Sequence, residues 1–135
     1  MKASGKILLV DDDPDFLDMH RAILQNHGYD VLTATSGQEG LERVRTEMPD
    51  LIILDLMMEK HDAGFSFSKS VKTDPLFRKI PILMVTSVAE ATGFRFSLEE
   101  DGYWMKTDDF LDKPVRPEVL LERVDRLLRK REEGP

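Results

Sequence analysis

The chain has 135 residues, which fits one domain, residues 1–135 with a core at about 6–130, and argues against several domains. Its 19 basic and 26 acidic residues give a net charge of −7, which disfavours direct binding to nucleic acid and to anionic membranes. The sequence has no cysteine, no apolar run of membrane-spanning length and no signal-peptide pattern, so it predicts a cytoplasmic protein without disulfides, thiolate chemistry or membrane insertion.

The first predicted unit is a buried strand followed by an amphipathic helix. Residues 6–10 form a short, continuous run of mostly branched apolar side chains, which is typical of a strand covered on both faces. Three aspartates follow the run. The last of them, Asp13, stands before Pro14 as an N-cap stands before the first residue of a helix. Gly28 fits the end of that helix.

The second unit repeats this order. Residues 29–35 predict a short strand, and Ser36 with Glu39 has the form of a capping box at the start of a helix. The helix is expected to bury an apolar face made of Leu41, Val44 and Met48.

A third strand is predicted at residues 51–54, which are all apolar and are followed by a carboxylate, Asp55. The next helix has a weaker pattern, because only Phe67 and Val71 stand at helical spacing before a stop near Pro75. The third unit therefore has a clear strand and a poorly defined helix.

Two further strands and a terminal helix complete the pattern. Residues 81–85 are apolar and end at Thr86, and residues 110–112 form a short strand before Lys113. Pro117 begins a helix with one apolar face, made of Leu120, Val124, Leu127 and Leu128. Strands that alternate with helices in this way predict an α/β fold, a doubly wound parallel sheet covered on both faces by right-handed crossovers.

Polar residues stand at the points where the strands end: Asp11, Asp12, Asp55, Thr86 and Lys113. In an open parallel sheet these ends meet at one edge, which is where such folds bind ligands. Three carboxylates close together repel one another, so the cluster requires a cation. Hard oxygen ligands without histidine or cysteine favour Mg²⁺.

Other polar residues have simpler structural interpretations. Asp13 is interpreted as the helix cap rather than as a ligand, because a single aspartate at a strand end is more often a cap. The three histidines are interpreted as surface residues outside the site: His20, His27 and His61.

Taken in order, these motifs resemble the receiver domain of bacterial two-component response regulators. The resemblance covers nearly the whole chain and rests on four motifs: Val10-Asp11-Asp12, Leu54-Asp55-Leu56, Val85-Thr86-Ser87 and Asp112-Lys113-Pro114. It implies a flavodoxin-like fold, with a five-stranded parallel sheet in the order 2-1-3-4-5 and helices on both faces.

The resemblance also implies a chemistry for the acidic site. Asp55 would accept a phosphoryl group from the phosphohistidine of a sensor histidine kinase or a phosphotransfer protein. Asp11, Asp12, Asp55 and the backbone carbonyl of Met57 would hold the Mg²⁺ that this transfer needs. The chain would then be a signalling domain that catalyses only its own phosphorylation and slow dephosphorylation, not an enzyme with an external substrate.

Two residues outside the acidic cluster, Thr86 and Lys113, are implied to contact the phosphoryl group once Asp55 carries it. Thr86 and the aromatic residue Phe110 would then switch a surface that a downstream effector protein recognises. Phe110 has an equally simple interpretation as a core residue. The sequence names neither the kinase nor the effector.

The sequence departs from the family pattern in two places. The segment after Asp55 lacks the usual proline and has either an inserted residue or an alanine, Ala63, in place of a glycine. Residues 87–109 form a longer segment than usual, with poor helical periodicity. This longer segment is interpreted as an inserted loop rather than as a dedicated partner surface.

Two other functions stay open on the sequence alone. A small Mg²⁺-dependent phosphatase of the haloacid-dehalogenase type also uses an aspartate after its first strand, which Asp11 and Asp13 match superficially. A pseudo-receiver would bind partners without being phosphorylated, but all the site positions carry the required chemistry. No output domain follows the terminal helix, so the chain is expected to be either a stand-alone receiver or a part of a longer protein.

Overall fold

The computed structural model describes residues 5–55, 67, 70–87, 109–113 and 116–133. Five strands lie within these ranges: β1 (Lys6–Val10), β2 (Asp30–Ala34), β3 (Leu51–Asp55), β4 (Ile82–Ser87) and β5 (Asp109–Lys113). The helices with described bounds are α1 (Pro14–Gln25), α2 (Gly37–Glu47) and α5 (Pro117–Glu133). Residues 67 and 70–73 are also helical. Every predicted strand is confirmed, as are the first, second and terminal helices.

The five strands form one parallel sheet in the order β2-β1-β3-β4-β5, which confirms the doubly wound fold. Val10 lies opposite Ala34 on one side and Leu54 on the other. Along the same row, Leu54 lies opposite Met84, and Met84 lies opposite Phe110. Because the strands run in one direction and in step, their carboxyl ends lie together at one edge of the sheet.

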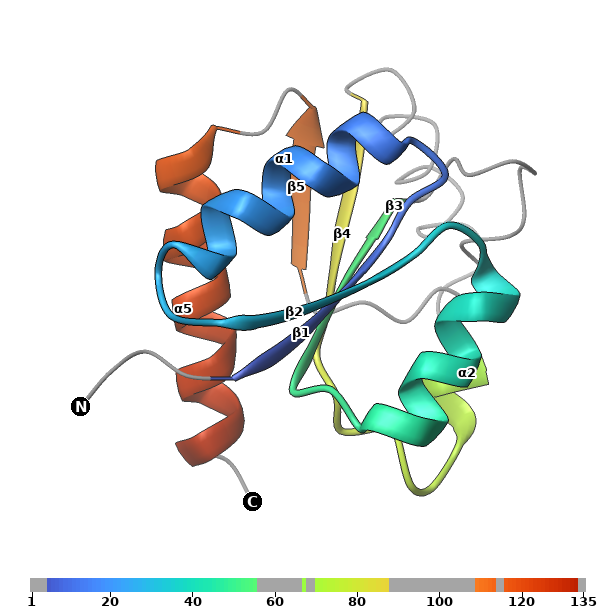
Figure 1. Cartoon of the computed structure of the whole chain (residues 1–135). Helices are drawn as coiled ribbons and strands as arrows, with labels where there is room; N and C mark the ends of the chain where they lie inside the picture. Colours follow the sequence, from blue (N-terminus) through green and yellow to red (C-terminus); the bar gives the residue numbers. More distant parts are fainter. Residues whose placement is uncertain (1–4, 56–66, 68–69, 88–108, 114–115, 134–135) are drawn as a thin grey trace.

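Helices cover both faces of the sheet: α1 and α5 pack on one face, and α2 with the segment 70–80 packs on the other (Figure 1). The side chains of β1 alternate between the two cores. Ile7 and Leu9 face α1 and α5, whereas Leu8 and Val10 face α2. This double burial explains the continuous apolar run of β1. The predicted apolar face of α5 is also confirmed in the core: Leu120, Val124, Leu127 and Leu128.

The first turn of α1 is fixed by the third aspartate of the run after β1. Asp13 is the N-cap, and its Oδ1 accepts a hydrogen bond of 3.0 Å from the Asp15 N–H. Pro14 occupies the first helical position, where its missing N–H is no loss. The helix ends at Gln25, just before Gly28, which has a φ of 92°. The cap prediction is therefore confirmed.

The second helix begins with a variant of the predicted capping box. Ser36 is the N-cap, and its Oγ accepts a hydrogen bond of 3.1 Å from the Glu39 N–H. Glu39 returns its carboxylate to the N–H of Thr35, at 2.8 Å, rather than to that of Ser36. The reciprocal bond is thus displaced by one residue toward β2.

The expected apolar face of α2 is wrong at one position. Met48 is the C-cap in a left-handed conformation, with a φ of 50°, and its side chain is 49% exposed. The residue that follows is Pro49, which disfavours the α conformation at the preceding position. Met48 therefore leaves the helix instead of extending its buried face.

Candidate functional site

The predicted site residues belong to strands that end at the same edge of the sheet. Asp55 is the last residue of β3, the central strand, and it lies opposite Val85. One and two residues further along β4, Thr86 and Ser87 lie opposite Asp112 and Lys113 of β5, respectively. The backbone therefore brings the predicted phosphoacceptor, hydroxyl and lysine positions together on three adjacent strands. Their side chains lie outside the described part of the structure.

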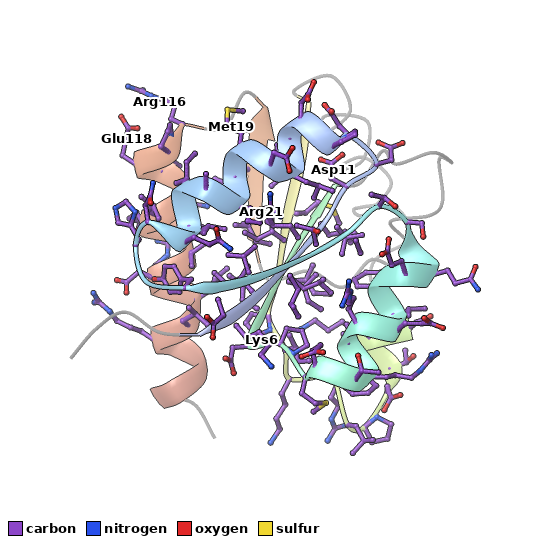
Figure 2. All side chains as sticks on the ribbon, viewed as in Figure 1. Lys6, Asp11, Met19, Arg21, Arg116 and Glu118 are labelled. Carbon is purple, nitrogen blue, oxygen red and sulfur yellow. The ribbon has the colours of Figure 1, made fainter. Side chains whose placement is uncertain are left out.

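Asp11 follows β1 directly and is the best-defined acidic residue of this edge. Its N–H donates to the carbonyl of Ala34 at 3.1 Å, which continues the β1–β2 pairing by one residue. Its Oδ1 accepts a hydrogen bond of 2.9 Å from the Asp13 N–H, and the side chain is only 1% exposed. Figure 2 shows Asp11 where β1 turns into α1. The carboxylate is therefore held in a defined orientation at the strand end.

Three consecutive aspartates have three different environments at this turn. Asp11 is buried, Asp12 is exposed, and Asp13 caps α1. This arrangement confirms the interpretation of Asp13 as structural, because its carboxylate is engaged with the helix. Asp11 and Asp12 remain as the acidic pair of β1.

The donor set of this edge fits a small, hard divalent cation. Since Val10 and Leu54 are paired, the next residues, Asp11 and Asp55, follow at neighbouring strand ends. A buried carboxylate beside further carboxylates is unfavourable without a compensating positive charge, and oxygen-only ligands suit Mg²⁺. Among the described side chains alone, no three acidic or imidazole groups converge into a metal cluster. The side chain of Asp55, which would complete the set, is not one of them.

Some predicted residues are not placed by the structure. Met57 and the rest of residues 56–66 lie outside the described ranges, as does most of the long segment 87–109, namely residues 88–108. The backbone of Phe110 lies in β5 opposite Met84, and its side chain is not described. The metal role of Met57 and the switch role of Phe110 therefore stay predictions.

The expectation that all three histidines are on the surface is wrong for His20. This side chain is 3% exposed, its Nδ1 lies 2.9 Å from the carbonyl oxygen of Phe16, and the two rings stack with centroids 3.9 Å apart. The sequence contained a signal for this burial, because His20 falls between Leu17 and Leu24 on the buried face of α1. His27 is exposed as predicted, and His61 lies outside the described residues.

Comparisons with known proteins agree with this fold. The family model of the response regulator receiver domain matches residues 7–125. The chain is 38% identical over 127 residues to the alkaline phosphatase synthesis transcriptional regulatory protein PhoP of Bacillus subtilis, covering 94% of this chain and 50% of that protein. It is 32% identical over 127 residues to protein PilH of Pseudomonas aeruginosa, covering 92% and 98%. The solved signal receiver domain of a signal transduction histidine kinase from Syntrophus aciditrophicus has a TM-score of 0.83 at 30% identity, covering 97% and 95%.

An open parallel sheet in this strand order defines a flavodoxin-like fold, a class in which ligands bind at the carboxyl edge of the sheet. The chain belongs to the response regulator receiver domain family and is thus a signalling domain of two-component systems. The comparisons give no support to a haloacid-dehalogenase phosphatase. The chain spans about half the length of PhoP. Within the described residues, no helix has the length and apolar character needed to cross a bilayer.

Proposed function

We propose that Asp55 accepts a phosphoryl group in a Mg²⁺-dependent reaction and that the chain acts as a phosphorylation-controlled switch. The observation that carries this proposal is the strand register at the carboxyl edge. Val10 and Leu54 are paired, so Asp11 and Asp55 follow at adjacent strand ends, and Asp11 is buried there with a fixed orientation. Family membership supports the same role.

The reaction requires one bond to form and one to break. A carboxylate oxygen of Asp55 bonds to the phosphorus, while the bond between phosphorus and the imidazole nitrogen of a phosphohistidine breaks. When bound, Mg²⁺ supplies neutralisation of the charge on the transferred group. Asp11, Asp12 and Asp55, with the carbonyl of Met57, are the residues proposed to hold it. Lys113 provides the positive charge that the chain itself brings to this edge.

The switch is proposed to run through β4 and β5. Thr86 lies on β4, which pairs with the strand of Asp55, and Lys113 lies on β5, which pairs with β4. A phosphorylated Asp55 gains negatively charged oxygens that a hydroxyl and an ammonium group bind. Attraction of Thr86 toward Asp55, accompanied by movement of Phe110, would change the surface formed beyond β4.

The partners are proposed from the family. The phosphoryl donor is a sensor histidine kinase or a phosphotransfer protein, and the output is a downstream effector protein. PhoP is a transcriptional regulator, and this chain matches 50% of it. The prediction that this chain does not itself bind nucleic acid rests on its net charge of −7. We also propose a cytoplasmic location, which the absence of cysteine supports. The extent of the single domain stays a prediction.

Intact mass spectrometry tests the proposal. After incubation with acetyl phosphate and Mg²⁺, we expect the wild type to gain the mass of one phosphoryl group and Asp55→Asn to gain none. Asp50→Asn is the matched control, because Asp50 stands just before β3 whereas Asp55 ends it. The control should be labelled like the wild type. Labelling of Asp55→Asn at the wild-type rate would contradict the assignment.

A further inference from the structure

α2 makes a close contact with the core that it covers, near the carboxyl edge of the sheet where the acidic residues stand. A methyl group built on Gly40 would lie 2.9 Å from Cε1 of Phe67 and 3.2 Å from Cγ2 of Val10. Both distances are shorter than ordinary van der Waals contact. The absence of a side chain at Gly40 therefore leaves a space that is bordered by the Phe67 ring and by the Val10 side chain of β1.

The three residues in this contact are almost completely excluded from water. Phe67 and Val10 are each 1% exposed, and both belong to the core between the sheet and α2. Figure 1 shows α2 and the segment 70–80 packed beside each other on this face. A displacement of a buried ring is transmitted to its neighbours, because protein cores are densely packed.

The position of the contact along the chain connects it to the site. Val10 is the last residue of β1, and Asp11 and Asp12 follow it. Phe67 is buried in the same core cluster as Val10, between the sheet and α2. The Phe67 ring and the Val10 side chain thus border the same position on α2, and Val10 directly precedes Asp11.

We propose that Phe67, seated in the gap left by Gly40, is a positioning residue for the carboxylates that hold Mg²⁺. The ring fixes the end of β1, and with it the orientation of Asp11, relative to the central strand. This inference rests on the proposed function, since it concerns the same metal site. Phe67 itself contacts neither metal nor phosphoryl group, and acts only through Val10.

The test compares two phenylalanines of one core. Phe67→Leu removes the ring behind the acidic edge, whereas Phe77→Leu removes a ring that also belongs to this core but stands in the turn before β4, at the opposite edge. For each variant we would measure unfolding by urea, the Kd for Mg²⁺ alone by calorimetry, and amide hydrogen exchange of Asp11 in the metal-free protein.

We expect Phe67→Leu to raise the Kd for Mg²⁺ on the order of tenfold, the scale seen when residues that support metal ligands are lost. The Asp11 N–H, which donates to Ala34, should exchange faster in the same variant. Phe77→Leu should lower stability by a similar amount and leave both quantities unchanged. With acetyl phosphate, Phe67→Leu should slow phosphorylation at low Mg²⁺ and recover at saturating Mg²⁺.

A second pair of variants tests the fit between ring and gap. Gly40→Ala should also weaken Mg²⁺ binding, because its methyl group displaces the Phe67 ring. In the double variant Gly40→Ala/Phe67→Leu, the smaller side chain makes room for the methyl group, so affinity should recover in part and the two changes should not be additive.

The outcomes separate this inference from the proposed function. If the wild type binds Mg²⁺ but Phe67→Leu and Phe77→Leu change its affinity equally, or not at all, the positioning role is wrong and the proposed function stands. If the wild type neither binds Mg²⁺ nor acquires a phosphoryl group, the proposed function is wrong and the inference falls with it.

Discussion

Charged groups are paired with opposite charges at one end of β1, whereas charges of like sign follow its other end (Figure 2). At the amino end, the Lys6 N–H donates to Asp50 Oδ2 at 2.8 Å, and the Asp50 N–H donates back to the Lys6 carbonyl at 2.7 Å. The Lys6 ammonium group reaches the carbonyl and the carboxylate of Glu47 at 3.2 and 3.3 Å. Opposite charges and backbone groups are matched there, so this end joins β1 to the turn between α2 and β3.

The carboxyl end instead gathers charges of one sign. Asp11, Asp12 and Asp13 follow one another, and Asp55 stands at the end of the next strand. Asp13 caps α1, and the buried Asp11 accepts a hydrogen bond from the Asp13 N–H. Charges that stabilise a fold tend to be paired, whereas like charges gathered at one edge cost stability and indicate a ligand. The comparison therefore supports the proposal that the carboxyl end binds a ligand, whereas the amino end stabilises the fold.

The largest expected effect is on metal binding at the carboxyl end. Asp11→Asn should weaken Mg²⁺ binding on the order of tenfold or more, about 1.4 kcal/mol, because it removes a charge while keeping an acceptor for the Asp13 N–H. Loss of like-charge repulsion should also raise the stability of the metal-free protein. Calorimetric titration and urea unfolding measure the two quantities. A Kd equal to that of the wild type would remove Asp11 from the metal site.

The matching change at the amino end should affect stability alone. Asp50→Ala leaves the Lys6 N–H without the carboxylate that accepts it, and should lower the free energy of unfolding by about 1–3 kcal/mol. Mg²⁺ affinity should be unchanged, because Asp50 and the acidic edge lie at opposite ends of the strands. A loss of Mg²⁺ binding in Asp50→Ala would contradict the separate roles of the two ends.

A third variant separates the two uses of aspartate within one turn. Asp13→Ala should destabilise the protein by about 1 kcal/mol, the usual cost of losing an N-cap, through the lost bond to the Asp15 N–H. Its Kd for Mg²⁺ should stay close to the wild-type value, in contrast to Asp11→Asn. Thermal unfolding with and without Mg²⁺ gives both results. An Asp13→Ala protein that no longer responds to Mg²⁺ would show that the cap also serves the site.

The smallest expected effect is a change in stability at acidic pH, caused by protonation of the carboxylate that bonds to Thr35 just after β2. The hydrogen bonds from the N–H and hydroxyl of Thr35 lower the pKa of the Glu39 carboxyl below its ordinary value. A carboxyl whose pKa is lower in the folded state contributes stability above its unfolded pKa and loses it as pH falls through the folded value. We expect wild type and Glu39→Gln to converge in stability below about pH 4, near the ordinary carboxyl pKa. A difference that stays constant from pH 7 to pH 3 would exclude this linkage.

Much of the fold could be predicted because its central strands β1, β3 and β4 are buried on both faces. A run such as residues 51–54 has no alternative environment in a protein of this size, and its end at Asp55 located the acidic edge. Asp13 could be separated from its neighbours because N-capping depends on local sequence alone.

Other features depend on packing between segments that are distant in the sequence. The burial of His20 follows from its position on the buried stripe of α1, which the polarity of histidine does not indicate. The gap at Gly40 is set by how closely α2 approaches β1 and by a ring from residue 67, so no local pattern reports it. For the site, the sequence indicated which strand ends meet, and the register then placed Asp11 and Asp55 at the ends of adjacent strands.

The bond between Thr35 and Glu39 also bears on strand pairing at the outer edge of the sheet. β2 is an outer strand of the sheet, and its alternate backbone groups pair with β1, as in the bonds from Asp30 to Gly5 and from Asp11 to Ala34. The Thr35 N–H is the last outward donor in this alternation, and the Glu39 carboxylate occupies it. A charged group there blocks the docking of a further strand from another molecule, which is a common defence against edge-to-edge aggregation. Protonation of Glu39 would therefore remove the negative charge beside this outer strand.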